Sequence, residues 1–391
     1  MNLQRFLTCV VWLSVLSGCG DEPSAPAPSF TALDSRVASA MESLHLPGVA
    51  VCVARGERVI FCRRYGQADL ETGRPMTEHT PLLLASITKT VTAVTIMSMV
   101  ERGLLDLDRP IVGSLDFKLG HPHADAVTLR HLLTHSGGIA DSAALGVTFY
   151  SIGRDSSIPL ADAVRGYFEP GGTYYNADAN FLPQAPGTTW SYANQGYSLV
   201  GRIGELAAGE DFREACRHAV LEPLRMDHSS LRLDDFSPNE VAVPYHWNGT
   251  RHDTYGPYTF ADYPNGGLFA SAYDIVRFAA AVGTPALLEA RGVLGRASRE
   301  EMLRPYIPAP EVDGTQAIGF IHTEFAGESM YGHDGSEWGV TTFMRIRARD
   351  GMAAVVLTNN GVKQGIEPAL AILESLFEVG TSLEHAPSRK D

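Results

Sequence analysis

The sequence lacks an excess of positive charge. Lys and Arg together number 31 against 45 Asp and Glu, which gives a formal net charge of -14 at pH 7. The basic residues form no stripe along the chain, and a protein that binds nucleic acid needs a basic surface to neutralise phosphates. The composition therefore excludes nucleic acid from the expected partners.

Cysteine is also scarce, and no spacing of cysteine and histidine predicts a zinc site. Residues 121–125 (HPHAD) begin like a metallo-hydrolase motif, but Ala126 stands where that motif needs a histidine. His131 and His135 are four residues apart on a short predicted helix, and capping or packing accounts for them better than metal binding because no third ligand is evident. We expect no metal and no other cofactor.

A run long enough to cross a bilayer is missing as well. The apolar run from Phe6 to Leu16 is too short, follows a positive start and precedes small residues, which is typical of an export signal. The sequence LSGC, ending at Cys19, resembles the lipobox of bacterial lipoproteins, in which the cysteine is lipidated. An ordinary cleaved signal with an incidental cysteine is the alternative. We expect an exported, membrane-anchored bacterial lipoprotein on the periplasmic or outer face.

Composition then divides the chain. We expect a signal peptide over 1–18 and a lipidated Cys19 with a flexible tether over 19–30, because residues 20–29 (GDEPSAPAPS) have too few apolar groups to fold. Residues 31–380 are long enough to bury a full core as one domain or two intimate ones, and 381–391 is expected to be a disordered tail.

An exported domain permits disulfides. Cys52 and Cys62 lie on opposite arms of a predicted hairpin over 49–64. A cross-strand disulfide is compatible with this spacing, but two small unbonded residues are preferred because register cannot be read from sequence. Further along, Ser271 and Asp274 have capping-box spacing, and 365–378 predicts a closing helix.

Three short motifs contain candidate catalytic residues. Ser86 and Lys89 stand three apart at the start of an apolar, helix-periodic run, so they share one helix face. A buried lysine loses its charge more easily and can then take the proton of a serine nucleophile. The alternative is a solvated helix face.

Tyr192 and Asn194 are two residues apart in an extended or loop segment and point to the same side. Tyr192 can relay a proton if Lys89 lowers its pKa, and Asn194 can donate to a substrate carbonyl and hold Lys89. A half-buried aromatic and a helix cap are the alternatives.

The third motif is His333-Asp334-Gly335, followed by Ser336. Gly335 allows substrate to approach an edge strand, and the N–H of Ser336 can serve as an oxyanion donor beside that of Ser86. His333 can contact Tyr192 or an anionic group of the substrate.

In this order and at these separations, the three motifs resemble the serine β-lactamase and penicillin-binding superfamily, in its class C-like branch. The framework segments LTHSGG, PGTTWSYANQGYSLVG and NGGLFASAYDIVRF are similar too. The resemblance implies an α+β fold, in which N- and C-terminal strands form an antiparallel sheet flanked by helices, with a mostly helical region inserted. It also implies acyl transfer through Ser86, with Lys89 and Tyr192 exchanging protons.

One departure from this family concerns the substrate. Class C β-lactamases typically have Lys-Thr-Gly as the third motif, and a lysine there presents a permanent cation to the β-lactam carboxylate. His333 is only partly charged near neutrality, and Asp334 adds a negative charge. We therefore rank an esterase or D-amino-acid-specific peptidase above a β-lactamase, with an ester, amide or cell-wall peptide as substrate. A non-catalytic binding lipoprotein and a metallo-hydrolase are the alternatives.

Overall fold

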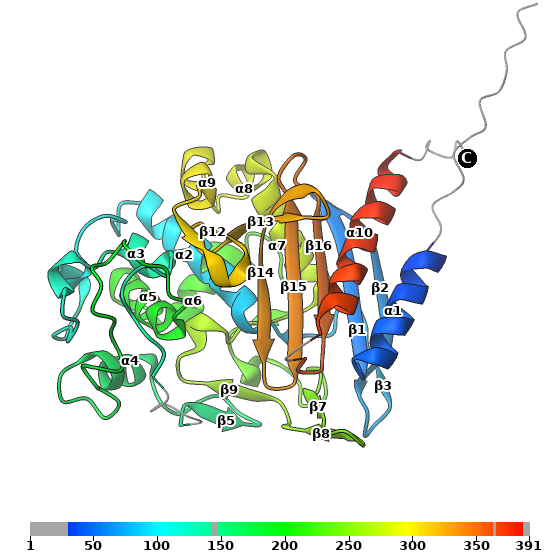
Figure 1. Ribbon diagram of the computed structural model, residues 1–391, viewed down its shortest axis with the longest axis horizontal. Helices are drawn as coiled ribbons and strands as arrows, with labels where there is room; N and C mark the ends of the chain where they lie inside the picture. Colours follow the sequence, from blue (N-terminus) through cyan, green and yellow to red (C-terminus); the bar gives the residue numbers. More distant parts are fainter. Residues whose placement is uncertain (1–29, 143–147, 363–364, 386–391) are drawn as a thin grey trace, which may run out of the picture.

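Nine strands form the central sheet of this computed structural model, which describes residues 30–142, 148–362 and 365–385 (Figure 1). The strand order is β11 (Ile307–Ala309), β12 (Gly314–Gln316), β13 (Ile321–Phe325), β14 (Glu328–Glu337), β15 (Val340–Arg347), β16 (Ala353–Thr358), β1 (Gly48–Arg55), β2 (Arg58–Asp69) and β3 (Arg74–Pro75). All neighbours pair antiparallel, and the first long strand of the chain, β1, pairs with the last, β16, inside the sheet. The expected α+β architecture is confirmed.

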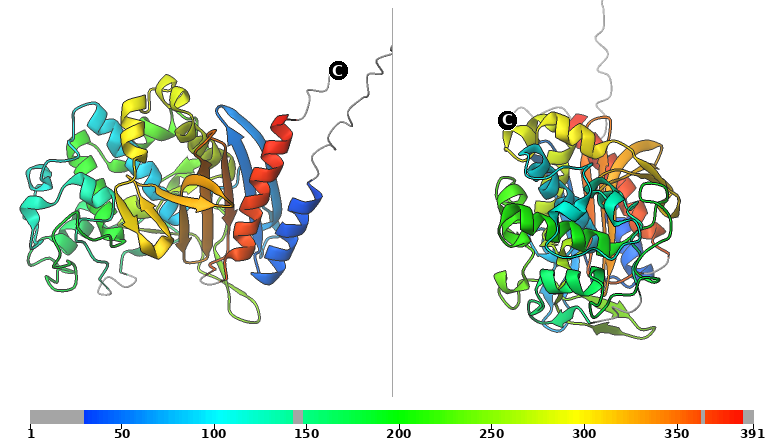
Figure 2. Two further views of the ribbon diagram at one scale, coloured as in Figure 1. Left: turned by 45° about the horizontal axis from the view of Figure 1, so that its top comes forward. Right: turned by 90° about the vertical axis from the view of Figure 1, so that its left-hand side faces the viewer.

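Strand β1 separates two hydrophobic cores. Val49, Val51 and Val53 face a core that α1 (Thr31–Ser43) and α10 (Glu367–His385) cover, and the intervening residues face the core that contains α7 (Ala272–Gly283). Helices α1 and α10 lie side by side on the outer face of the sheet (Figures 1 and 2). The two ends of the domain are therefore packed against the same surface.

Helix α10 continues beyond the expected end of the domain at residue 380. It runs to His385, and Leu383 packs against the core between α1, α10 and the sheet. The expectation of a disordered tail from 381 was wrong for these residues because an apolar contact holds the last turns. Residues 386–391 lie outside the described residues, as do the predicted signal peptide, the tether over 20–29 and Cys19.

The β1–β2 hairpin contains a disulfide between Cys52 and Cys62. The two residues are direct partners in the strand register, so their side chains lie on the same face of the hairpin. The preference for two unbonded cysteines was therefore wrong, and the register that decides it depends on a bulge between Val53 and Ala54 that the sequence does not reveal.

The helical region lies beside the β11–β14 half of the sheet (Figure 1). Its helices are α2 (Thr88–Glu101), α3 (Leu129–Leu133), α4 (Leu160–Phe168), α5 (Asn194–Ala208), α6 (Phe212–Cys216), α8 (Pro285–Ala290) and α9 (Arg296–Leu303). Helix α2 is buried on nearly all sides, as its uninterrupted apolar middle predicts. Among the described residues, no helix combines the length and hydropathy that a bilayer span requires.

Small sheets connect the two halves. They contain β4 (Leu82–Leu83), β10 (Phe269–Ala270) and β6 (Ser229–Ser230); β5 (Tyr150–Ile152) and β9 (Tyr258–Phe260); and β7 (Tyr245–Trp247) and β8 (His252–Thr254). The sheet that contains β4 and β10 fixes the chain just before Ser86. Strand β4 pairs with β10, and the next residue, Leu84, donates its N–H to the carbonyl of Leu268 at 2.8 Å.

Helix α7, on the inner face of the sheet, begins with half of the predicted capping box. The Ser271 hydroxyl accepts a hydrogen bond from the Asp274 N–H at 3.1 Å. The Asp274 carboxylate instead accepts from the His228 N–H and the Ser229 hydroxyl. The cap therefore also joins α7 to the segment that contains β6.

We predict that Ser271→Ala lowers the free energy of unfolding by about 1 kcal/mol, because it removes the cap acceptor of a buried helix. Urea denaturation of the two proteins measures this difference. Ser237→Ala, on an exposed side chain outside α7, is the matched control. An equal stability of Ser271→Ala and wild type would show that the cap contributes nothing.

Candidate active site

Ser86 lies in a strained turn immediately before α2. The turn is η1 (Ala85–Ile87), and Ala85 has a φ of 50°, in the left-handed region that residues with a Cβ rarely adopt. The Leu84 carbonyl accepts a hydrogen bond from the Thr342 hydroxyl at 2.9 Å. A Cβ on Gly335 would lie 2.3 Å from that carbonyl oxygen, so only glycine lets β14 approach so closely. The sheet thus holds the strained turn.

The amine of Lys89 is fully buried beside Ser86. Its Nζ lies 3.1 Å from Ser86 Oγ, 2.7 Å from Asn194 Oδ1 and 2.7 Å from the carbonyl oxygen of Asn265. The last two are acceptors only, so they use both N–H bonds of a neutral amine. The remaining lone pair then faces Ser86 Oγ, which is the arrangement a base needs.

Burial lowers the pKa of Lys89 to about 7, because desolvation disfavours the ammonium form. The negative charges of Asp141, Glu337 and Asp262 oppose this effect and favour the ammonium. The neutral form of the amine, which a base requires, is therefore accessible near neutral pH. The prediction that burial would lower this pKa is confirmed.

Tyr192 donates a hydrogen bond to Ser86 Oγ at 2.8 Å. The condition under which Tyr192 would relay a proton, a pKa lowered by Lys89, is not met: burial raises the pKa of this phenol well above its usual value. The phenol therefore keeps its proton and acts as a donor. Its ring stacks on His135 with centroids 4.3 Å apart, and His135 Nδ1 accepts from the Ala193 N–H.

Asn194 is positioned by Asp141, a residue that the sequence did not single out. The Asp141 carboxylate accepts from the N–H and Nδ2 of Asn194, both at 2.8 Å, and from the N–H of Gln195 at 3.0 Å. Asp141 thus caps α5 from a distant loop, and Asn194 is left free to accept from Lys89. A separation of 53 residues gives no local signal for this contact.

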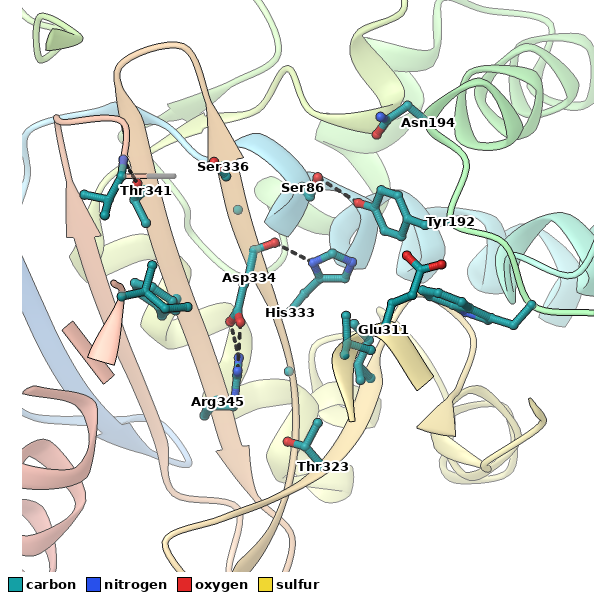
Figure 3. A pocket seen from close by; sticks show the side chains of 18 residues that line it. Ser86, Tyr192, Asn194, Glu311, Thr323, His333, Asp334, Ser336, Thr341 and Arg345 are labelled. Atoms are coloured by element: carbon teal, nitrogen blue, oxygen red, sulfur yellow. Dashed lines mark hydrogen bonds and ion pairs between the residues drawn. The ribbon is translucent and has the colours of Figure 1, made fainter. Parts of the chain in front are cut away.

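His333 is neutral in this environment. Burial and the charge of Lys89 lower its pKa to about 4, and its Nδ1 lies 2.6 Å from the Asp334 carbonyl oxygen. The Asp334 side chain forms a bidentate ion pair with Arg345 (Figure 3). His333 packs near Tyr192, as expected, with ring centroids 6.1 Å apart. It offers no cation to an anionic substrate group.

A cavity of about 510 Å³ brings most of the predicted residues together (Figure 3). It is lined by Ser86, Tyr192, Asn194, His333, Gly335 and Ser336, among others. Lys89 lies behind Ser86. Strand β13 pairs with β14 only up to Gly332, so residues 333–337 form a locally open edge beside the cavity. The sequence predicted an edge strand at Gly335. In the structure, β14 lies inside the sheet and only its end, residues 333–337, is an open edge.

The histidines that resemble metal ligands have other contacts. His121 and His123 lie 3.2 and 3.1 Å from the carbonyl oxygens of Gly138 and Pro183. His131 completes a capping box with Thr128 at the start of α3. In the part of the chain that the structure describes, no group of His, Cys, Asp and Glu is placed to hold a metal ion.

Comparison with known proteins places this site in a family. The family model described as Beta-lactamase matches residues 33–376, which include the whole site. The chain belongs to the beta-lactamase family. Its Ser86–Lys89, Tyr192–Asn194 and His333–Gly335 motifs thus lie within a serine hydrolase superfamily, as the resemblance indicates.

The names of individual relatives of this beta-lactamase family protein describe different activities. Esterase EstB of Burkholderia gladioli is 32% identical over 55% of this chain and 54% of its own length. Penicillin-binding protein 4 of Amycolatopsis lactamdurans is 27% identical over 81% and 82%. The alignment thus spans only about half of the esterase, and no single activity follows from the family.

Solved structures share the fold. The octameric penicillin-binding protein homologue of Pyrococcus abyssi superposes with a TM-score of 0.72 and 25% identity, over 89% of this chain and 77% of that one. The D-amino acid amidase of Ochrobactrum anthropi SV3 gives 0.70 and 21%, over 89% and 99%. The second likeness concerns the fold alone.

We predict that one lysine titrates near pH 7. The chain has four lysines, so a protein labelled with ¹³Cε-lysine gives few signals, and Lys89→Arg identifies the signal of Lys89. Glu337→Gln should lower its titration midpoint, because a charge that favours the ammonium is removed. A Lys89 midpoint near 10, or one unchanged in Glu337→Gln, would contradict this electrostatic description.

Proposed function

We propose that this protein is a serine hydrolase that forms an acyl-enzyme on Ser86. One observation carries the proposal: Ser86 Oγ lies between a buried amine whose N–H bonds are taken by two acceptors and a phenol that donates to it. A serine in this setting has both a base for its own proton and an acid for a leaving group.

The proton transfers follow from these contacts. Ser86 Oγ attacks the substrate carbonyl as its proton passes to the neutral Lys89 amine, and a C–O bond forms. The bond to the leaving group then breaks, and Tyr192 supplies the proton that the leaving alkoxide or amine needs. Lys89 returns a proton to Tyr192, and water hydrolyses the acyl-enzyme by the reverse sequence. The backbone N–H groups of Ser86 and Ser336 are the proposed oxyanion donors.

The charge of the cavity favours an ester, or a D-amino-acid amide without a free carboxylate, over a β-lactam. Among the described residues that line it, the cationic side chain Arg345 is occupied by Asp334, and His333 is neutral. A β-lactam carboxylate would find no free cation there. The similarity to an esterase supports the same order, and β-lactamase activity is the second candidate.

We predict that the protein hydrolyses nitrophenyl butyrate and that Ser86→Ala lowers kcat/KM by about a thousandfold or more, because the nucleophile is lost. Tyr192→Phe should lower kcat/KM for methyl butyrate about a hundredfold, because its alkoxide needs a proton from a general acid, and should affect the nitrophenyl ester less. A chromogenic cephalosporin should be cleaved far more slowly than the ester. Release of nitrophenol is followed at 400 nm or so, with Ser237→Ala as control.

Each result separates the candidates. Equal turnover by Ser86→Ala and wild type would contradict the assignment of Ser86 as the nucleophile. If wild type shows no turnover and takes up no fluorophosphonate probe, the protein is a binding module rather than a hydrolase. Activity that a chelator abolishes would indicate a metallo-hydrolase.

We also infer that the protein is exported and anchored to a bacterial membrane through a lipid on Cys19. The lipobox-like sequence before Cys19 supports the lipid anchor. The disulfide between Cys52 and Cys62 supports export, because disulfides persist in oxidising compartments.

Expression of the full chain in a bacterium tests the anchor. We expect wild type in the membrane fraction, with the mass of a diacylglycerol on the mature protein. Cys19→Ala should lose that mass increment, whereas Cys9→Ala, within the signal, should retain it. A wild-type protein without added lipid mass would exclude the anchor.

A further inference from the structure

The active-site cavity extends past the open edge of β14 to the outer face of the sheet. His333 and Asp334 are consecutive on this strand, so their side chains point to opposite faces, and both line the cavity. On the outer face, where α1 and α10 lie, the cavity is lined by Asp334, Phe343, Arg345, Val362 and Ile366. We call this region the outer part of the cavity.

Asp334 and Arg345 form an ion pair within the outer part. In the strand register Gly332 lies opposite Arg345 and Asp334 lies opposite Phe343, so the two charged residues are diagonal neighbours on one face. Arg345 Nη2 donates to Asp334 Oδ2 at 2.9 Å, and Nη1 donates to Oδ1 (Figure 3). A Cβ on Gly332 would lie 3.0 Å from Arg345 Cδ, so this glycine leaves room for the arginine side chain.

Asp334 is the more accessible member of the pair. Its side chain is 44% exposed, whereas that of Arg345 is 10% exposed. Among the described residues that line the cavity, Arg345 is the one with a permanent positive charge, and Glu311 adds a second negative charge. A ligand carboxylate binds a guanidinium through two parallel N–H···O bonds, which is the arrangement that Asp334 already makes. Asp334 therefore occupies the position that a substrate carboxylate would take.

We propose that Asp334 is a specificity-determining residue, which occupies Arg345 in place of a substrate carboxylate and so confines the protein to substrates that are uncharged in the outer part. The inference rests on the proposed acyl transfer to Ser86. An anionic group there meets the carboxylates of Asp334 and Glu311 and must displace Asp334 to reach the guanidinium. An uncharged group meets no such repulsion and can pack against the apolar side chains of the same wall.

Matched esters test the charge alone. On the leaving-group side, 4-butyryloxybenzoate is compared with 4-butyryloxybenzamide, in which a carboxamide replaces the carboxylate. On the acyl side, the monomethyl ester of succinate is compared with methyl succinamate. We expect wild-type kcat/KM, measured by pH-stat, to be about tenfold or more higher for the uncharged ester in at least one pair, as for the loss of a charge-assisted hydrogen bond.

Variants then locate the effect. Asp334→Asn should lower the preference for the uncharged ester about tenfold in the same pair, because Arg345 can then bind the carboxylate. The change requires the cation, so adding Arg345→Gln to Asp334→Asn should cancel most of it. Glu324→Gln, an exposed carboxylate of β13 outside the cavity lining, makes the same change in net charge and should keep the wild-type preference. Thermal melting shows which variants are folded.

The outcomes are distinguishable. A wild type that hydrolyses esters through Ser86 and accepts the charged and uncharged members of both pairs equally overturns the proposed role of Asp334 alone. A folded Asp334→Asn that lowers activity toward both esters alike also overturns it, since a purely structural ion pair gives that result. So does a shift that persists without Arg345 or that Glu324→Gln reproduces.

Two further results complete the test. If Asp334→Asn does not fold, Asp334→Thr replaces it, because threonine suits a strand; if neither folds, the wild-type comparison decides. A wild type that cleaves none of the esters, nitrophenyl butyrate included, overturns the proposed function itself.

Discussion

The burial of one lysine amine is the constraint on which the site depends. Lys89 lies inside the domain, where an ammonium is poorly solvated, and its remaining contacts are oxygen acceptors of Asn194 and Asn265. Each acceptor must come from a different part of the helical region, so α2, α5 and the η7 turn (Tyr263–Asn265) have to meet at this point. The amine therefore finds both acceptors only where these three elements meet.

The serine next to it is held by a different means. Ala85 adopts a backbone conformation that costs free energy. Contacts from the sheet, such as the hydrogen bond from the Thr342 hydroxyl to the Leu84 carbonyl, stabilise this turn. Because Gly335 has no side chain, β14 reaches the turn directly. The nucleophile and the base thus lie only three residues apart in the chain but are fixed by opposite halves of the domain.

The parts of this arrangement that the sequence predicts are those encoded locally. The pairing of Ser86 with Lys89 follows from helix geometry, and that of Tyr192 with Asn194 from their spacing. Asp141 and Asn265 were not predicted as site residues. Asp141 contacts Asn194 across 53 residues of the chain, and Asn265 contacts Lys89 across 176. The raised pKa of Tyr192 could not be predicted for a related reason. A motif indicates a neighbouring charge such as that of Lys89, whereas desolvation depends on every side chain packed around the ring.

The pairing of β1 with β16 also constrains how the protein is made. These strands are partners in the middle of the sheet although about 300 residues separate them in the chain, as Val49 opposite Thr358 shows. Strand β1 leaves the ribosome long before β16, so the two strands cannot pair until residue 358 has been synthesised. Contacts this distant in sequence form slowly, and the edge of β1 that pairs with β16 has no partner strand until then. Closure of the sheet therefore waits for a segment far along the chain from its first strand.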